Sequence, residues 1–408
     1  MKYLQRGLTT GLKNALQGFP AVMLHGARQV GKTTFLRREL GDDYRYVSLE
    51  PLSVRQLALD DPAGFLDLYR PPIIFDEVQY APGLLPFIKE RIDSNRDAMG
   101  QYILTGSQNL LMMEQVSETL AGRTAVLQMH PLSHREIKGE PNRPLPWFYT
   151  GELHEDTTAF GKRVAFSESL LAGGYPDVVT GKSVSRQMWF DSYIQTYLER
   201  DVRRLRNIGD LVQFQNFLKV TALRSGQLFN LKNVGTTLGL SGNTVKAWLS
   251  VLEASGLIFM LRPYYANGGK RLVKTPKVYF NDTGLLCHLL GLTSAEEVAL
   301  SPHAGAIMET SVLLEIRSAI SFKGKRPELY FWRTSNGAEV DIVVVDRGRL
   351  VPVEVKFSAT PKPKMARGLK SFQSTYDDSE LGNGWVVHYG DLPLPLGDGD
   401  IALPFSSL

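Results

Sequence analysis

Short apolar runs alternate with amphipathic stretches over the first third of the chain. Five of these runs have the length and composition of buried strands, at residues 21–25, 44–49, 72–77, 101–107 and 124–129. Segments with helical spacing of apolar residues separate them. This alternation predicts a mostly parallel sheet covered by helices on both faces, in which ligands bind at the carboxyl ends of the strands.

The pattern changes along the rest of the chain. Residues 138–165 are irregular and polar, which predicts a linker, and long helical patterns dominate residues 166–292. A second αβ pattern follows, with a helix near Glu309 and two strands between residues 340 and 355. We therefore predict an α/β fold with domains at 1–137, 166–292 and 293–408, the first two joined by the linker at 138–165.

Composition places the chain among ordinary globular proteins. It has 408 residues, of which 43% are hydrophobic and 22% charged, so a disordered or fibrous chain is excluded. No apolar run approaches the roughly 18 residues of a membrane span, and the start lacks the apolar core of a secretory signal. We expect a cytoplasmic protein with no membrane partner. The single cysteine, Cys287, excludes an internal disulfide and a cysteine-based zinc site.

The formal net charge of +4 is unevenly distributed. Residues 183–275 contain 13 Lys and Arg against 5 Asp and Glu, a local charge of +8, which leaves −4 for the remainder. A basic segment of this kind is typical of proteins that bind a polyanion such as DNA. Solvated helix faces produce the same pattern and remain the alternative, also for the arginines of the segment at residues 198–207.

A glycine-rich motif, G-x-x-x-x-G-K-[ST], lies directly after the first predicted strand and before a helix. Its glycines let backbone N–H groups surround phosphate oxygens, Lys32 contributes charge to the outer phosphates, and the Thr33 hydroxyl reaches Mg²⁺. The N-terminus of the following helix adds a partial positive charge. The predicted nucleotide-binding residues are Gly26, Ala27, Arg28, Gln29, Val30, Gly31, Lys32, Thr33 and Thr34.

Two acids end the third predicted strand, at the sheet edge where this loop should lie. Asp76 is expected to hold Mg²⁺ through water, and Glu77 to orient or deprotonate the attacking water. The next strand ends at Ser107, which places a hydroxyl, or the adjacent Gln108, toward the γ-phosphate. A helix cap and a plain turn are the structural alternatives.

Several further motifs accompany these residues: GARQVGKTT, IIFDEVQYAP, ILTGSQ, LAGRTAVLQMHPLSHRE, GGYPDVV, YIQTYLERDV, KVYFNDTGL and the pair EVDIVV and VEVK. Together they resemble the AAA+ ATPases, and the whole chain is similar to a large family of bacterial and archaeal predicted ATPases with a C-terminal domain of unknown function. The resemblance implies that Ser107 is the first sensor. It also implies that Arg123 reaches the nucleotide of a neighbouring subunit in a homo-oligomeric ring such as a hexamer, a local salt bridge being the alternative.

The basic middle segment contains a helix-turn-helix pattern. Leu231, Val234 and Leu238 form one apolar stripe, and Ser241 caps a second helix. A strand at 257–261 and a turn at residues 267–269 then predict the hairpin of a winged helix. The candidate DNA contacts are Asn243, Thr244, Lys246, Lys270, Arg271 and Lys274. Docking of a protein partner is the alternative use of such a module.

Near the C-terminus, two strands flank a tight turn at residues 347–348. A two-residue hairpin there would place Asp341 opposite Glu354, where like charges destabilise a sheet unless a cation lies between them. Lys356 points to the same face, and Glu309 falls on the buried stripe of the preceding helix, where an unpaired carboxylate is costly.

This set resembles the PD-(D/E)xK nuclease site, in which the acids hold Mg²⁺ and the lysine assists the attacking water. The resemblance implies a second metal site formed by Glu309, Asp341 and Glu354, with Lys356. Val340 stands where that pattern has proline, and Pro352 lies inside the second strand, where it would disturb the pairing. The alternative is a salt-bridged set in which Glu339 faces Lys356.

The sequence thus predicts an oligomeric ATPase that uses ATP and Mg²⁺ to remodel or translocate DNA. An ATP-gated, metal-dependent endonuclease is the second hypothesis. A nucleotide-dependent switch that binds a protein partner is the third.

Overall fold

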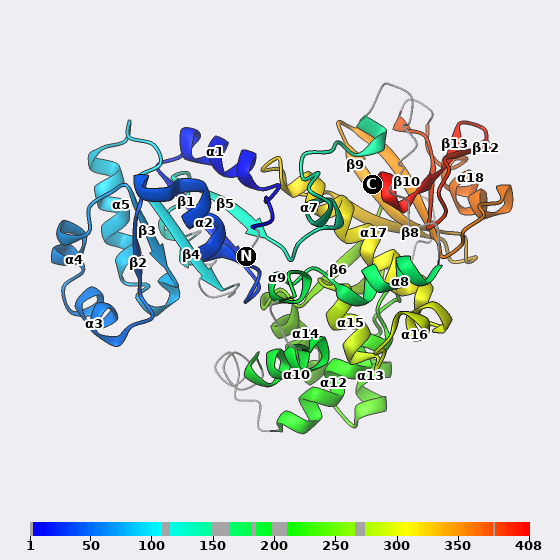
Figure 1. The fold of residues 1–408 in the computed structure, drawn as a ribbon, viewed down its shortest axis with the longest axis horizontal. Coiled ribbons are helices and arrows are strands. Elements are labelled where there is room, and N and C mark those ends of the chain that lie inside the picture. Colours follow the sequence, from blue (N-terminus) through cyan, green and yellow to red (C-terminus); the bar gives the residue numbers. More distant parts are fainter. Residues whose placement is uncertain are drawn as a thin grey trace.

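The computed structural model describes residues 3–107, 115–116, 118–148, 163–181, 185–197, 210–265, 274–377 and 380–408. Two sheets, one near the N-terminus and one that extends to the C-terminus, are connected by a helical region (Figure 1). The helices are α1 (Thr9–Gly18), α2 (Lys32–Leu40), α3 (Leu52–Asp60), α4 (Pro62–Leu68), α5 (Leu84–Ser94), α7 (His134–Lys138), α8 (Arg163–Ala172), α9 (Pro176–Val179), α10 (Arg186–Tyr197), α12 (Leu211–Leu223), α13 (Leu231–Leu238), α14 (Gly242–Ala254), α15 (Thr283–Leu289), α16 (Ala295–Leu300), α17 (Ala304–Ser321) and α18 (Arg367–Gln373).

The first sheet has five strands in the order β2-β3-β4-β1-β5, and all its pairings are parallel. They are β1 (Ala21–Gly26), β2 (Arg45–Ser48), β3 (Ile73–Asp76), β4 (Tyr102–Ser107) and β5 (Thr124–Met129). The five-stranded parallel sheet predicted from the sequence is therefore confirmed.

Both faces of this sheet are buried. Along β1, Val22 and Leu24 pack in the core that contains side chains of α1 and α2, whereas Ala21 and Met23 pack with those of α4 and α5. Such strands need apolar residues at every position, which explains the continuous hydrophobic runs. Because all five strands are parallel, their carboxyl ends meet at one edge of the sheet.

The helical region contains α12, α13 and α14, followed by the antiparallel strands β6 (Ile258–Pro263) and β7 (Lys277–Phe280). Gly239 in the left-handed conformation ends α13, and Ser241 caps α14 as predicted. The second strand of this pair begins at Lys277, and Lys274, which the sequence placed on the wing, lies outside a strand. The predicted turn at 267–269 lies outside the described residues.

The second sheet has eight strands in the order β12-β13-β11-β10-β9-β8-β6-β7. Its remaining strands are β8 (Leu329–Arg333), β9 (Glu339–Asp346), β10 (Arg349–Lys356), β11 (Trp385–His388), β12 (Leu394–Gly397) and β13 (Asp400–Pro404). Strand β6 pairs with β8, so hydrogen bonding continues across the domain boundary expected at residue 293. Helix α17 packs on one face of this sheet and α18 on the other.

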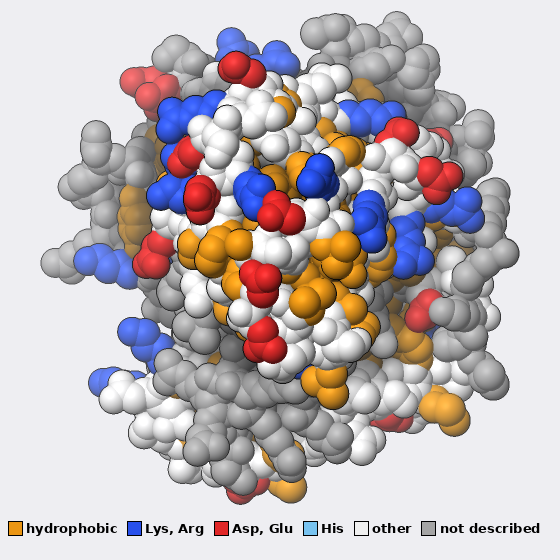
Figure 2. All heavy atoms as spheres, turned by 90° about the vertical axis from the view of Figure 1, so that its left-hand side faces the viewer, with side chains coloured by type: hydrophobic (Ala, Val, Ile, Leu, Met, Phe, Trp, Pro, Cys, Tyr) orange, Lys and Arg blue, Asp and Glu red, His pale blue; other side chains and the backbone are white. Residues whose placement is uncertain are grey.

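The outer end of the first sheet carries exposed apolar side chains. Helices α3 and α4 expose Leu52, Leu57, Leu59 and Leu68. Figure 2 views this end of the molecule and shows hydrophobic side chains interspersed with charged ones. Within the part of the chain that the structure describes, no helix is long and apolar enough to cross a membrane.

Candidate functional site

The glycine-rich loop connects β1 to α2, as predicted, at the carboxyl edge of the first sheet. A side chain at Gly26 would place its Cβ only 2.2 Å from the carbonyl oxygen of Met129 on β5. Gly31 precedes α2 with φ of 91°, a conformation that other residues adopt only with strain. The close approach at Gly26 and the left-handed turn at Gly31 therefore determine the shape of the loop.

Lys32 reaches back over this loop from the first turn of α2. Its ammonium donates hydrogen bonds of 3.0 Å to the carbonyl oxygens of Gly26 and Ala27, and its side chain is buried. The ammonium is thus held over the loop where the outer phosphates of a nucleotide would lie. His25, the last residue before the loop, is also buried, and burial together with Lys32 and Arg317 lowers its pKa to about 4.

Asp76 ends β3 beside the loop and is 6% exposed. The Thr33 hydroxyl donates to its Oδ2 at 3.0 Å, and the hydroxyls of Tyr46 and Thr105 also donate to the carboxylate. Burial and the bond to Asp76 raise the pKa of Tyr46. Thr33 and Asp76, the two predicted Mg²⁺ ligands, are therefore in contact, and they present the oxygen donors that Mg²⁺ prefers.

Glu77 follows β3 with φ of 60°, in the left-handed region. Its backbone N–H points to Thr105 Oγ1 at 3.4 Å, and its carboxylate accepts a hydrogen bond from the side-chain amide of Gln79. Ser107, the predicted sensor, ends β4, but its side chain and all of Gln108 lie outside the described residues. Thr105, two positions earlier, is the β4 hydroxyl that contacts Asp76.

A buried arginine supports the loop from the N-terminal segment. Arg6 donates to the carbonyl oxygens of Val30 at 2.9 Å and His130 at 2.6 Å, and pairs with Glu136 at 2.9 Å. Glu136 also completes the capping box of α7 with Ser133. The N-terminal segment, the glycine-rich loop and α7 are thus joined through one guanidinium.

A cavity of about 310 Å³ opens beside the loop. Its walls come from four parts of the chain: the N-terminal segment with Tyr3, the loop and α2 with Val30 and Thr34, the end of β5 with Met129, and α9 with Pro176. Helix α9 contains the last four residues of the GGYPDVV motif, whose role the sequence left open. A mostly apolar cavity next to a phosphate-binding loop has the position and lining expected for a nucleotide base.

Arg123 lies just before β5, at the edge of the sheet opposite to the glycine-rich loop. Its guanidinium binds both carboxylate oxygens of Asp93, with Nε to Oδ1 at 2.8 Å and Nη2 to Oδ2 at 3.0 Å. In this conformation Arg123 forms the local salt bridge that the sequence left as the alternative to an action in trans.

The predicted DNA contacts are only partly described. Asn243 and Lys246 are exposed on the first half of α14, and Lys274 is exposed before β7. Thr244 exchanges hydrogen bonds with Ser241, so its hydroxyl serves the cap of α14. Lys270 and Arg271, together with the arginines between residues 200 and 206, lie outside the described residues.

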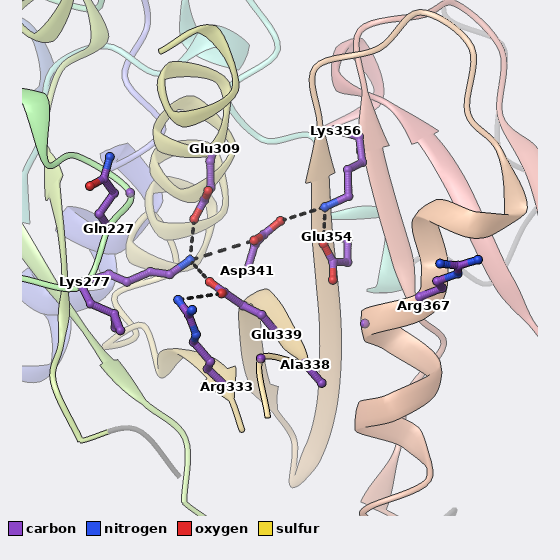
Figure 3. A pocket seen from close by; sticks show the side chains of 14 residues that line it. Gln227, Lys277, Glu309, Arg333, Ala338, Glu339, Asp341, Glu354, Lys356 and Arg367 are labelled. Carbon is purple, nitrogen blue, oxygen red and sulfur yellow. Dashed lines mark hydrogen bonds and ion pairs between the residues drawn. The ribbon is translucent and has the colours of Figure 1, made fainter. Parts of the chain in front are cut away.

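The four predicted nuclease-like residues line a second cavity, of about 700 Å³ (Figure 3). Residues of α17, β9, β10 and the start of α18 form its walls. The pairing of Arg349 with Asp346 and of Val353 with Ile342 confirms the two-residue hairpin that places Asp341 opposite Glu354. Pro352 pairs with Val343 without a shift in register, so the expected disturbance does not occur. Asp341 also accepts the backbone N–H of Val355 at 2.9 Å.

Charged contacts within this cavity differ from the predicted ones. Lys356 pairs with Glu354 at 2.5 Å and with Asp341 at 3.6 Å, so the acids are salt-bridged as in the alternative, but Lys356 does not face Glu339. Glu339 instead pairs with Arg333 at 3.1 Å and with Lys277 at 2.6 Å. Burial and the adjacent Asp341 carboxylate raise the pKa of Glu354.

Lys277, at the start of β7, is the residue of this cavity that the sequence reasoning missed. Its ammonium lies 3.1 Å from Glu309 and 3.9 Å from Asp341, and Tyr279 donates its hydroxyl to Glu309. Among the described residues, no three His, Cys, Asp or Glu side chains are arranged to hold a metal ion. In the sequence, KVYFNDTGL contributes only as a family motif, and no strand is predicted at residues 277–280.

The strand order, the phosphate-binding loop after β1 and the buried carboxylate at the end of β3 give the first sheet and its helices the fold of a P-loop ATPase core. Residues 18–138 match a family described as an AAA domain. Residues 163–296 and 304–408 match two families described as domains of unknown function, DUF8612 and DUF4143.

Comparison with known proteins then identifies the family. The uncharacterized protein Rv2008c of Mycobacterium tuberculosis is 30% identical over 404 residues, covering 98% of this chain and 83% of that protein. The chain therefore belongs to the same family as Rv2008c. The uncharacterized protein MJ1544 of Methanocaldococcus jannaschii is 22% identical over 88% of this chain and 80% of its own length. Among solved structures, the Walker-type ATPase paby2304 of Pyrococcus abyssi has a TM-score of 0.45 at 14% identity, covering 70% of this chain and 96% of that chain.

Proposed function

We propose that this protein hydrolyses ATP with Mg²⁺ at the glycine-rich loop and uses the reaction to act on a nucleic acid held by α14. The observation that carries the first part is the 3.0 Å contact between the Thr33 hydroxyl and the buried Asp76 carboxylate, next to the loop whose carbonyls hold the ammonium of Lys32. A cation site of oxygen donors next to a phosphate-binding loop is the arrangement that phosphoryl transfer requires.

Each residue of this site has a separate task in the proposed reaction. Backbone N–H groups of the loop and the α2 N-terminus bind the phosphates, and Lys32 exchanges its bonds to the Gly26 and Ala27 carbonyls for bonds to the outer phosphates. Thr33 and Asp76 would hold Mg²⁺, which neutralises the charge that develops on the phosphates. Thr105 and Tyr46 orient the Asp76 carboxylate through their hydroxyl groups.

Glu77 is the proposed base for the attacking water. Its carboxylate is bound to the Gln79 amide, so it must turn away from Gln79 before it can accept a proton from water. The adenine is assigned to the cavity between Tyr3, Val30 and Pro176. Because α9 forms one wall of that cavity, bound nucleotide would contact the helical region as well as the first sheet.

The nucleic-acid part of the proposal rests on the helix pair α13 and α14 and the β6–β7 hairpin. This order of elements is that of a winged helix, whose second helix enters a groove. Asn243 and Lys246 are exposed on the first half of α14, where such helices contact nucleic acids. The surrounding residues 183–275 carry the local charge of +8.

The experiment that tests the proposal measures ATPase rate with and without duplex, single-stranded and branched DNA. We expect Lys32→Ala to abolish turnover, and DNA to stimulate the wild type. The double variant Lys246→Ala with Lys274→Ala should weaken DNA binding and reduce its salt slope by about two. Lys362→Ala with Lys364→Ala, which removes two exposed lysines of the C-terminal region, is the matched control. A rate that no DNA changes contradicts the nucleic-acid part only.

The rival hypotheses give different results in the same assays. A protein partner recovered with the full chain, in the absence of DNA binding, favours the nucleotide-dependent switch. Nicking of DNA that requires Asp341 favours the ATP-gated endonuclease. We rank this hypothesis below the ATPase because the acids of the second cavity are paired with lysines. The ring-shaped homo-oligomer remains part of our proposal, and its test is the role of Arg123.

A further inference from the structure

The second cavity contains a buried lysine that comes from a different part of the chain than the acids around it. Glu309 lies on α17, Asp341 on β9 and Glu354 on β10, whereas Lys277 enters from β7 of the hairpin that follows α14. The Lys277 side chain is only 3% exposed. Figure 3 shows its ammonium in the middle of the acidic groups, with interactions to three of them.

Ammonium groups and carboxylates alternate across the cavity. Lys277 lies between Glu309 and Asp341, and Lys356 lies between Asp341 and Glu354. Lys277 thus contacts both Glu309 and Asp341, and Lys356 contacts both Asp341 and Glu354. The like-charge repulsion expected for Asp341 opposite Glu354 is relieved by side chains of the protein itself.

This arrangement does not fit the divalent ion of a PD-(D/E)xK site. Mg²⁺ requires oxygen ligands at about 2.0–2.1 Å in octahedral geometry. The Glu309 and Asp341 oxygens that would supply them lie 3.1 and 3.9 Å from the Lys277 ammonium, so a divalent ion between them would lie next to a like charge. Lys356, the lysine of the nuclease pattern, is a separate residue on the other side of Asp341.

The position of Lys277 is fixed by its backbone and by its surroundings. Its residue pairs with Leu261 on one side and with Leu228 on the other, and its ammonium lies 5.5 Å from the centre of the Phe331 ring. The ammonium is thus held in one place, within 4 Å of three carboxylates.

We propose that Lys277 is the resident cation of this site and takes the place of a divalent metal ion. The acids of the second cavity then form a metal-free, charge-compensated cluster, and the chain does not use it for metal-dependent cleavage of phosphodiesters. A neutral side chain at position 277 would remove the ammonium that Glu309, Glu339 and Asp341 share, although Glu339 would keep Arg333 and Asp341 would keep Lys356. These carboxylates would then bind a divalent ion.

The test measures Mn²⁺ binding to nucleotide-free protein by electron paramagnetic resonance, in the Lys32→Ala background so that the glycine-rich loop does not contribute. We expect no Asp341-dependent Mn²⁺ binding by the parent protein. Lys277→Met should bind one Mn²⁺ per chain at least tenfold more tightly than the parent, and its melting temperature should rise when Mn²⁺ is added. Lys277→Met with Asp341→Asn should lose both effects.

Lys13→Met, which removes an exposed lysine from α1, is the control for the loss of one positive charge. Two results would overturn the proposal: a parent protein that binds Mn²⁺ and loses it on Asp341→Asn, or a folded Lys277→Met protein that gains no binding. If Lys277→Met fails to fold, the double variant with Glu309→Gln removes one charge of each sign and takes its place. The comparison of the parent with Asp341→Asn needs no variant at Lys277.

Discussion

The guanidinium of Arg317 donates a hydrogen bond of 2.6 Å to the side-chain oxygen of Asn281. Arg317 lies on α17, eight residues after Glu309, and Asn281 follows β7, four residues after Lys277. Both steps span about 12–13 Å, at roughly 1.5 Å per helical residue and 3.3 Å per strand residue. Helix α17 and strand β7 are thus joined at two levels, through Lys277 and Glu309 at the acidic cavity and through Arg317 and Asn281 near β5.

This buried contact predicts a measurable coupling energy. Arg317→Met and Asn281→Ala should each lower the free energy of unfolding. The double variant should lower it by about 1.5–3 kcal/mol less than the two single losses added together, because the hydrogen bond to the charged group is lost only once. Urea unfolding of the four proteins gives the value. Arg317→Met with Asn230→Ala, which removes a distant helix cap, should be additive. If the losses of Arg317→Met and Asn281→Ala were also additive, the hydrogen bond between the two residues would contribute nothing to stability.

Glu77→Gln should separate nucleotide binding from hydrolysis. The amide cannot accept a proton, so turnover should fall by about 10²–10⁴ while ATP still binds. Filter retention of labelled ATP and phosphate release measure the two properties. Glu90→Gln on α5, an exposed acid, is the matched control and should behave as the wild type does. Wild-type turnover by Glu77→Gln would remove Glu77 from the mechanism.

Arg123 has two possible tasks, which paired variants distinguish. If it acts on the nucleotide of a neighbouring subunit, Arg123→Ala should lower kcat by about 10³–10⁵. Asp93→Ala removes the same local salt bridge but leaves the arginine, so it should keep near-normal kcat. We expect kcat to fall in Arg123→Ala but not in Asp93→Ala. We also expect the turnover rate per subunit of the wild type to rise with protein concentration, because an arginine that acts in trans needs an assembled neighbour. Equal and small effects of the two variants would leave Arg123 with its local role alone.

His25 predicts a loss of stability in acid. Its pKa is about 4 in the folded chain, because of burial and the charges of Lys32 and Arg317, against 6.5 for an unperturbed histidine. The unfolded chain therefore binds a proton that the folded chain does not, and this residue costs the fold roughly 3 kcal/mol as the pH falls from 6.5 to 4. Above pH 6.5 His25 is neutral in both states, so its contribution to the free energy of unfolding no longer changes with pH.

Urea unfolding at pH 7 and pH 4.5 tests this prediction. The stability difference between the two pH values should be about 2–3 kcal/mol smaller in His25→Gln than in the wild type. His303→Gln, at a partly exposed position, should leave the difference unchanged. The same difference in all three proteins would show that His25 does not titrate on unfolding.

The first sheet and its loop could be predicted from the sequence because their signals are local. Continuous apolar runs indicate strands buried on both faces, and residues 26–33 form a motif whose chemistry depends on spacing alone. The hairpin at residues 347–348 is equally local, which is why counting along it placed Asp341 opposite Glu354. Tyr46 and Thr105 were missed, since only the order of strands in the sheet brings their hydroxyls to Asp76.

The C-terminal sheet and its cavity could be predicted only in part. Strands β8, β11, β12 and β13 are short, and the pairings of β8 with β6, of β11 with β10 and of β13 with β11 are parallel and connect segments that are distant in the chain. Lys277 carries no sign of burial in its own sequence, because lysine is rarely buried and becomes so only when acids from other elements surround it. The pairing of β6 with β8 creates that environment, and no local pattern announces it.

The pairing of β6 with β8 has a mechanical consequence. A backbone ladder that runs without interruption from β7 to β12 leaves no hinge between α14 and the acidic cavity. Under the proposed function, a nucleic acid bound at α14 would therefore keep a fixed distance from the second cavity while nucleotide binds and leaves. On the same proposal, motion driven by ATP would then occur where the first sheet meets the C-terminal sheet, at side-chain contacts such as that of Arg317 with Gln128.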